Sequence, residues 1–191
     1  MADEHDYFYR WGKKRDIKKL SDHGYNSKTD DWLWVLFGDE TGGLTEYILG
    51  RKGVEEGVWG VRFHKSALHA GNCYMNPDGQ IGHPDIDKRK EIAAICNIEP
   101  CTGDPDVPFE GYDNYWDYIS DKFDVCLSGD DERTEMRRKC MHKEYMNASL
   151  RTPCRIIPDY FQFARIEDPY SVKDYKFDVK WKDRDETDWG E

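Results

Sequence analysis

The chain has 191 residues, with 39 acidic against 28 basic side chains and a formal net charge of -11. Because a domain averages roughly 150 residues, this length predicts a single domain. The negative charge argues against a protein that grips phosphate backbones, and the longest apolar run, 32–37, is far shorter than the roughly 20 residues that cross a bilayer. We therefore expect no nucleic-acid partner and no transmembrane span.

The composition combines many charges with many aromatic rings. Charged residues make up 35% of the chain, and aliphatic core formers are few, which favours disorder. The chain also has 7 Trp, 12 Tyr and 8 Phe. These residues favour an ordered structure, because each buried aromatic ring removes about 150–250 Å² from water. We expect such a chain to complete its packing against other proteins.

Residues 1–29 are predicted to form an N-terminal arm. The arm begins with acidic and aromatic residues, so we expect neither a secretory signal nor an Arg-rich presequence. A basic segment follows at 10–19, and it is a candidate contact for an acidic partner subunit or for anionic lipid headgroups. Its candidate binding residues are Arg10, Lys13, Lys14 and Arg15.

Residues 30–108 are predicted to be a loop-rich region of aromatic residues and glycines with one short helix. The Gly42-Gly43 pair suggests a turn between two short elements. The later glycines do not have the spacing of a phosphate-binding loop. The segment 85–96, directly after Pro84, has the pattern of a helix, because proline is favoured in the first helical turn.

Residues 109–157 are predicted to form a helical hairpin. Aromatic and apolar side chains after Asp113 recur at spacings of three and four, which places them on one face of a helix. The polar segment 128–135 is a natural turn, and a second helix is expected from Met136 until shortly before Pro153.

Residues 158–191 are predicted to be an extended acidic and aromatic C-terminal arm. Large side chains alternate with charged ones, as in a strand or in an arm pressed along a surface, which is a common mode of partner binding. The fold class expected from the whole pattern is mostly irregular with α-helices, a helical hairpin and extended N- and C-terminal arms. The candidate partner-binding residues of the C-terminal arm are Tyr175, Phe177, Val179 and Trp181.

The six cysteines can form three disulfides in fifteen possible pairings. In a reducing cytosol they would instead be small buried thiols. A bridge between Cys126 and Cys140 would join the two expected helices, and the position of the turn makes it feasible without enforcing it. The other candidates for disulfides are Cys73, Cys96, Cys101 and Cys154.

A family resemblance rests on the same segment, 113–154. Trp116 lies ten positions before Cys126, and Leu150 lies ten positions after Cys140. This spacing resembles the twin C-x9-C hairpin of mitochondrial intermembrane-space proteins with its outer cysteine pair replaced. The run 126–146 also resembles the cysteine-containing hairpin of the PDSW subunits of respiratory complex I.

The resemblance implies a function and a location. It implies a non-catalytic, disulfide-stapled accessory subunit of a mitochondrial inner-membrane respiratory complex. Such a subunit would lie peripherally on the intermembrane-space face, would bind other subunits and would need no cofactor.

Two alternatives remain open. A zinc-binding protein or enzyme is suggested by imidazole and thiol ligands within one half of the chain, although their spacing differs from that of common zinc motifs. The second alternative is an acidic inhibitor that binds a basic protein surface. The alternative zinc ligands are His64, His69, Cys73, Cys96 and Cys101.

Overall fold

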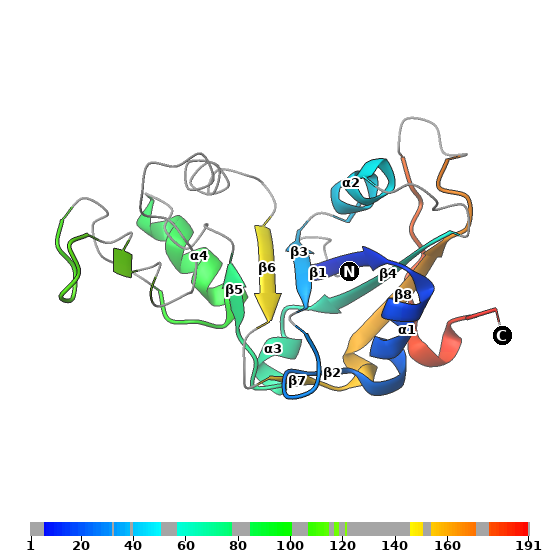
Figure 1. The fold of residues 1–191 in the computed structure, drawn as a ribbon, viewed down its shortest axis with the longest axis horizontal. Helices are drawn as coiled ribbons and strands as arrows, with labels where there is room; N and C mark the ends of the chain where they lie inside the picture. Colours follow the sequence, from blue (N-terminus) through cyan, green and yellow to red (C-terminus); the bar gives the residue numbers. More distant parts are fainter. Residues whose placement is uncertain are drawn as a thin grey trace.

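The computed structural model describes residues 6–31, 33–38, 40–50, 57–77, 85–100, 107–114, 117–118, 121, 146–150, 154–170 and 176–190. They form a mixed α/β fold around an antiparallel sheet of seven strands in the order β5-β6-β3-β1-β4-β8-β9 (Figure 1). Its strands are β1 (Tyr7–Gly12), β3 (Trp34–Phe37), β4 (Val58–His64), β5 (Met75–Pro77), β6 (Met146–Leu150), β8 (Phe161–Ile166) and β9 (Lys182–Asp183).

A second, two-stranded sheet and several short helices complete the fold. The small sheet pairs β2 (Tyr25–Asn26) with β7 (Arg155–Ile156). The α-helices are α1 (Lys14–His23), α2 (Gly42–Gly50), α3 (Ala67–Ala70) and α4 (Ile86–Cys96), and the 3₁₀ helices include Pro158–Tyr160 and Arg184–Glu186. None of the described helices is long and apolar enough to cross a membrane.

The expected fold class, mostly irregular with a helical hairpin and extended arms, is wrong. The last part of the expected second helix is strand β6, which pairs with β3 from Trp34↔Ser149 to Phe37↔Met146. The expected N-terminal arm contains β1, and the expected C-terminal arm contains β8, and both strands pair with β4 along its length. Most of the hairpin, residues 122–145, lies outside the described residues.

The short helix expected over 85–96 is confirmed as α4. Asp85 caps its first turn, because the side chain accepts hydrogen bonds from the backbone N–H groups of Asp87 and Lys88. Asn97 ends it in the left-handed conformation with φ 58°. The Asn97 side chain then donates to the backbone carbonyl of Cys73 at 2.7 Å, which ties the helix end to the body of the fold.

A row of four phenylalanines crosses one face of the sheet and organises the main core. Phe8 lies opposite both Phe37 and Phe63, and Phe63 lies opposite Phe161. Successive ring centroids along the row are 4.7, 5.2 and 5.7 Å apart. All four rings are buried together with apolar residues of α1, α3 and α4. Cross-strand aromatic pairs of this kind stabilise a sheet beyond their buried area.

The opposite face of the sheet carries a smaller cluster centred on Trp11. Leu44 and Ile48 of α2 pack there, so α2 covers this face, as Figure 1 shows beside β1 and β3. The six-membered ring of Trp11 lies directly on the Cα of Gly60, where a Cβ atom would overlap it. Gly60 therefore provides the space in which the indole ring lies flat on the sheet.

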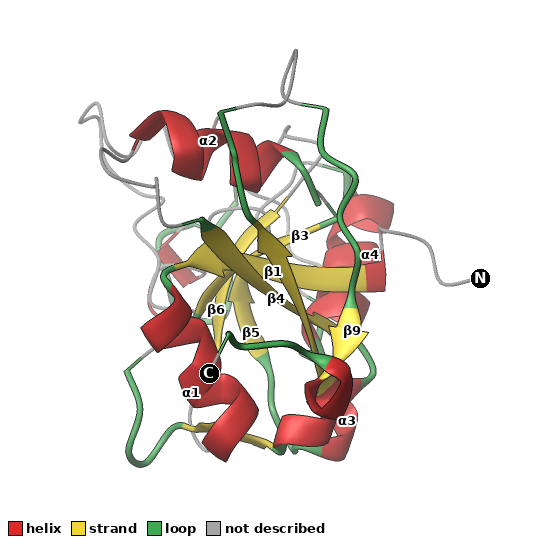
Figure 2. Cartoon of the chain, turned by 90° about the vertical axis from the view of Figure 1, so that its right-hand side faces the viewer, coloured by secondary structure: helices red, strands yellow, loops and turns green. Residues whose placement is uncertain are grey.

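The C-terminal segment wraps around the edge of the sheet. Strand β9 pairs with Gln162 and Phe163 of β8, and Figure 2 shows the chain passing along this edge before it turns across the sheet. Trp181, just before β9, contacts Trp11 on one face with 5.5 Å between ring centroids. Trp189, after β9, stacks on Trp59 on the other face at 4.8 Å. The two tryptophans thus hold the segment to both faces.

Candidate functional site

The candidate site is an aromatic pocket between β1, β3 and α2, with a cavity volume of about 290 Å³. It forms because β1 and β3 pair only at Phe8↔Phe37 and Tyr9↔Leu36 and then separate. Four of its eight lining residues carry aromatic rings. This aromatic pocket is lined by Tyr9, Arg10, Trp11, Trp34, Val35, Leu36, Gly43 and Tyr47.

Arg10 and Trp34 form the side of the pocket where the strands separate. The Arg10 guanidinium donates a hydrogen bond to the backbone carbonyl of Trp34 at 2.9 Å and so bridges the two strands. The Trp34 side chain stands at the rim and is 51% exposed. A large ring held at the rim by a rigid strand can contribute much binding energy, since tryptophan is enriched among residues that dominate protein interfaces.

Trp11 carries the polar group of the pocket that lacks a partner. The residue is 7% exposed, and its Nε1 has no hydrogen-bond acceptor among the described residues. The Cδ1 edge of the ring, next to Nε1, lies toward the pocket-lining Gly43, whose added Cβ would sit 3.7 Å from Cδ1. An unsatisfied buried donor costs about 1–3 kcal/mol. Nε1 is itself shielded from solvent, and no acceptor among the described residues offsets this cost.

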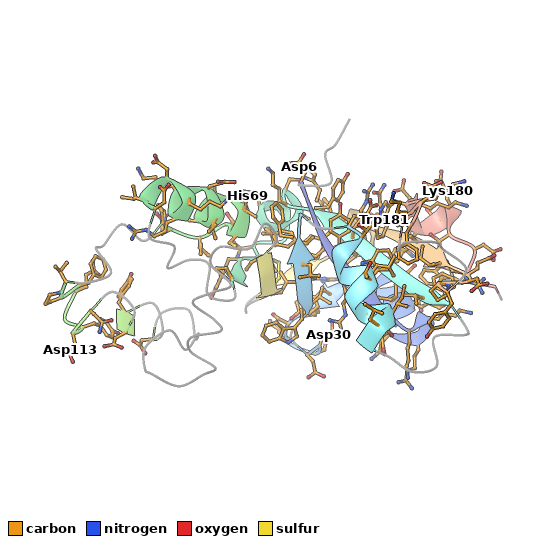
Figure 3. The ribbon with its side chains drawn as sticks, turned by 90° about the horizontal axis from the view of Figure 1, so that it is seen from above. Asp6, Asp30, His69, Asp113, Lys180 and Trp181 are labelled. Carbon is orange, nitrogen blue, oxygen red and sulfur yellow. A yellow bond between two sulfur atoms is a disulfide. The ribbon has the colours of Figure 1, made fainter. Side chains whose placement is uncertain are left out.

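Behind the pocket, the ring of Trp181 rests on Tyr9 at a centroid distance of 5.7 Å. Its Nε1 donates to the carboxylate of Glu40, which fixes the ring in place. The Arg62 guanidinium lies over the Trp181 ring, 5.0 Å from its centroid. The Nε of Arg62 also donates a hydrogen bond to the side-chain amide oxygen of Gln162 at 2.9 Å. Figure 3 shows Trp181 and the neighbouring Lys180 at the end of the molecule opposite Asp113. These contacts support Tyr9, which lines the pocket, from behind.

The predicted partner-binding residues occupy different environments. Arg10 lines the pocket, whereas Lys13 and Arg15 are exposed at the start of α1 and Lys14 is half-buried there. In the C-terminal segment, three of the predicted residues pack against this chain's own cluster around Trp11, and Tyr175 lies outside the described residues. The three packed residues are Phe177, Val179 and Trp181. Their role in binding a partner stays a prediction.

The disulfide in the structure joins Cys73 to Cys154, with 4.6 Å between the Cα atoms. Both residues are among the disulfide candidates expected from the sequence, which leaves their pairing open. The bond connects the end of α3 to the start of β7, and the Ser27 hydroxyl accepts from the Cys154 N–H at 2.8 Å. Cys126 and Cys140, the preferred pair, lie outside the described residues, as does Cys101.

The alternative metal ligands do not assemble in the described part of the chain. No group of three or more His, Cys, Asp or Glu side chains there could hold a metal ion. Cys73 is oxidised, so it cannot act as a thiolate ligand, and His64 Nδ1 is within 2.8 Å of the Ser66 hydroxyl. Cys96 lies on α4, and complete burial raises the pKa of its thiol. His69 ends α3.

Most of the pocket was missed from the sequence. The sequence predicts a binding role for Arg10 from its charge, whereas Trp11, Trp34 and Tyr47 enter only through the counts of aromatic residues. A possible signal was Gly43 after the apolar run 32–37, since a glycine beside aromatic strands can mark a close approach of side chains.

Comparison of the chain with models of protein families, with curated proteins and with solved structures finds no match. The function must therefore be argued from the geometry of the pocket.

Proposed function

We propose that this chain is a non-catalytic structural protein that binds other proteins through the aromatic pocket. One observation carries the proposal: the half-exposed Trp34 lines the same pocket as the buried Trp11, whose N–H has no acceptor among the described residues. The pocket offers rings, one guanidinium and N–H donors, which suit recognition of a polypeptide. Its volume of about 290 Å³ is at the lower end of the range for small-molecule sites and fits one or two side chains of a partner.

The narrower proposal is an accessory subunit of a mitochondrial respiratory complex on the intermembrane-space face of the inner membrane. It depends on the resemblance of residues 113–154 to cysteine-stapled hairpins. The Cys73–Cys154 disulfide adds support for an oxidising compartment, because such bonds are rare in the cytosol. The strand β6 at the end of this segment weakens the resemblance, so the experiment has to test location separately from binding.

The binding proposal is tested with three tagged forms of the chain expressed in cells of its source. We expect the unaltered chain to migrate on a native gel well above its own 22.6 kDa. Trp34→Ala should shift it to that mass without a change in melting temperature. Tyr170→Ala is the matched control, because Tyr170 is an exposed aromatic residue, 57% accessible, that does not line the pocket. A native chain running alone, or an unchanged Trp34→Ala assembly, contradicts the proposal.

The location is tested by protease treatment of isolated mitochondria. A protein on the intermembrane-space face should resist protease until the outer membrane is ruptured, and should then be digested. Digestion in intact mitochondria, protection after rupture, or absence from the organelle would refute the narrower proposal while leaving the binding function in place.

A further inference from the structure

We infer that Arg62 and His64 of β4 bind a carboxylate group of a partner protein beside the aromatic pocket. The inference rests on the proposed binding function and adds a second contact, whose ligand is an acidic side chain or a C-terminal carboxylate. Tyr9 connects the two places, because it lines the pocket and lies directly opposite Arg62 in the register of β1 and β4. Residues in such a pair have Cβ atoms about 4.5–5.5 Å apart, so a partner in the pocket lies within reach of Arg62.

Arg62 is held in place by contacts from three other elements of the chain. Its guanidinium carbon lies 4.0 Å from the centroid of the Tyr7 ring and 5.0 Å from that of Trp181. Its Nε donates to the amide oxygen of Gln162 at 2.9 Å, and the amide nitrogen of Gln162 donates to Asp183 at 3.1 Å. Because the guanidinium is already oriented, it loses little side-chain entropy when a ligand binds.

These contacts leave the two Nη groups of Arg62 without a hydrogen bond or an ion pair among the described residues. The chain has 39 acidic side chains that could have supplied one. Arg165 of β8 also lies over a tryptophan ring, and it does pair with a carboxylate, that of Glu167 at 3.7 Å. A guanidinium keeps its charge at physiological pH, and its N–H groups match the two oxygens of a carboxylate. Arg62 is therefore an oriented cation to which the described residues supply no anion.

His64 provides a second donor on the same face of β4. It follows Arg62 by two residues, so both side chains point to one face about 7 Å apart along the strand, and both contact the ring of Tyr7. Nδ1 of His64 accepts from the backbone N–H of Ser66 at 3.2 Å, so the neutral ring carries its proton on Nε2. That Nε2 makes no hydrogen bond among the described residues.

Charge favours a carboxylate over a phosphate group at this site. Lys180 and Lys182 are exposed on either side of Trp181 in the sequence and add to the local attraction for an anion. The chain as a whole carries a charge of -11, which repels a dianion more strongly than a monoanion. The rings of Tyr7 and Trp181 also keep water from part of the guanidinium, which strengthens its pairing with a single carboxylate.

The experiment is an NMR titration of the full chain with short capped peptides. One probe is acetyl-Gly-Glu-Gly-amide, with a side-chain carboxylate, and the other is acetyl-Gly-Gly-Gly, with a C-terminal carboxylate. Acetyl-Gly-Gln-Gly-amide is the neutral control, and inorganic phosphate is the rival anion. We expect at least one carboxylate peptide to shift the Nη signals of Arg62 saturably, whereas the glutamine peptide should not. The tighter of the two peptides identifies the source, and equal binding means that the site recognises the carboxylate alone.

Variants are compared through the indole N–H signal of Trp181, which every form retains. Arg62→Gln should weaken carboxylate binding at least about tenfold, because a hydrogen-bonded charge pair is lost. Arg62→Lys should weaken it about fivefold, since lysine keeps the charge but cannot form the two parallel hydrogen bonds. Arg165→Gln is the matched control and should leave binding unchanged, because Arg165 is already paired with Glu167.

The native gel then tests whether the site contacts the partner. Arg62→Gln should shift the assembly toward 22.6 kDa, Arg165→Gln should not, and Arg62→Lys replaces Arg62→Gln if the latter lowers the melting temperature. If no carboxylate peptide binds, or if phosphate binds more tightly than both, the carboxylate site is wrong. If Arg62→Gln and Arg62→Lys leave intact an assembly that Trp34→Ala disrupts, the partner contact is wrong and the proposed function stands. If only the Arg62 variants disrupt it, the aromatic pocket fails as the binding site and the carboxylate contact stands.

Discussion

Removal of the Cys73–Cys154 disulfide should destabilise the fold strongly. The two residues are only 1% and 5% exposed, and they are separated by 81 residues in sequence. The chain-entropy relation for a loop of this length gives about 4.5 kcal/mol. Native disulfides typically contribute about 2–4 kcal/mol when measured, so we expect a loss within that range.

The assay is urea unfolding followed by tryptophan fluorescence. The test variant carries Cys73→Ala and Cys154→Ala together, because alanine leaves no unpaired polar group in the core. The double variant should unfold at a lower urea concentration, and dithiothreitol should shift the unaltered chain toward the same midpoint. Cys96→Ala controls for the loss of a buried sulfur atom, since Cys96 is buried and outside this bond. An unchanged midpoint in the double variant would refute the reasoning.

The remaining predictions concern packing and pH. Gly60→Ala should destabilise the chain by about 1–3 kcal/mol, because the new Cβ overlaps the ring of Trp11; a urea midpoint within error of the original would contradict this. Burial raises the pKa of Cys96 above its ordinary value of 9.0, so the folded state holds this proton more tightly and stability should fall as pH rises above that value. Above pH 9.0, Cys96→Ala should reduce the downward slope of stability against pH by up to about 1.4 kcal/mol per pH unit, measured by urea unfolding between pH 8 and 11; an unchanged slope would disprove the assignment. Trp189→Ala should free the C-terminal segment and speed hydrogen exchange in β9, whereas equal exchange would show that the stacking on Trp59 does not hold it.

Local signals predicted local structure well. The helix over 85–96 is predictable because its proline and its apolar spacing lie within one short segment, and the structure adds the Asp85 cap. The strand β1 was missed because aromatic residues occupy both of its faces, at Tyr7, Phe8 and Tyr9, so the usual alternation of polar and apolar residues is absent. A strand buried on both faces cannot be identified from periodicity alone.

Long-range pairing accounts for most of the errors. Strand β6 pairs with β3, which lies more than a hundred residues earlier in the chain. No local sequence pattern predicts a pairing over that separation. The pocket has the same origin, because its lining residues come from β1, β3 and α2, which lie apart in the sequence. Its aromatic residues are evident in the sequence, but the sequence does not predict that they line one pocket. The disulfide illustrates this too, since the Cys73–Cys154 pairing follows from the sheet that brings α3 to β7.

Most of the described tryptophan rings pack within this chain. This packing supports the aromatic pocket as the binding site, because it sets Trp34 apart from the others. Among the described tryptophans, Trp11 and Trp59 are buried, and Trp181 and Trp189 pack against the two faces at the sheet edge. Trp34 alone among them is more than half exposed. The other described indole rings are buried or packed against the sheet, whereas Trp34 lines the pocket with half of its surface exposed. A bound partner would remove this exposed apolar area from water, which is why the pocket is the candidate interface of the described residues.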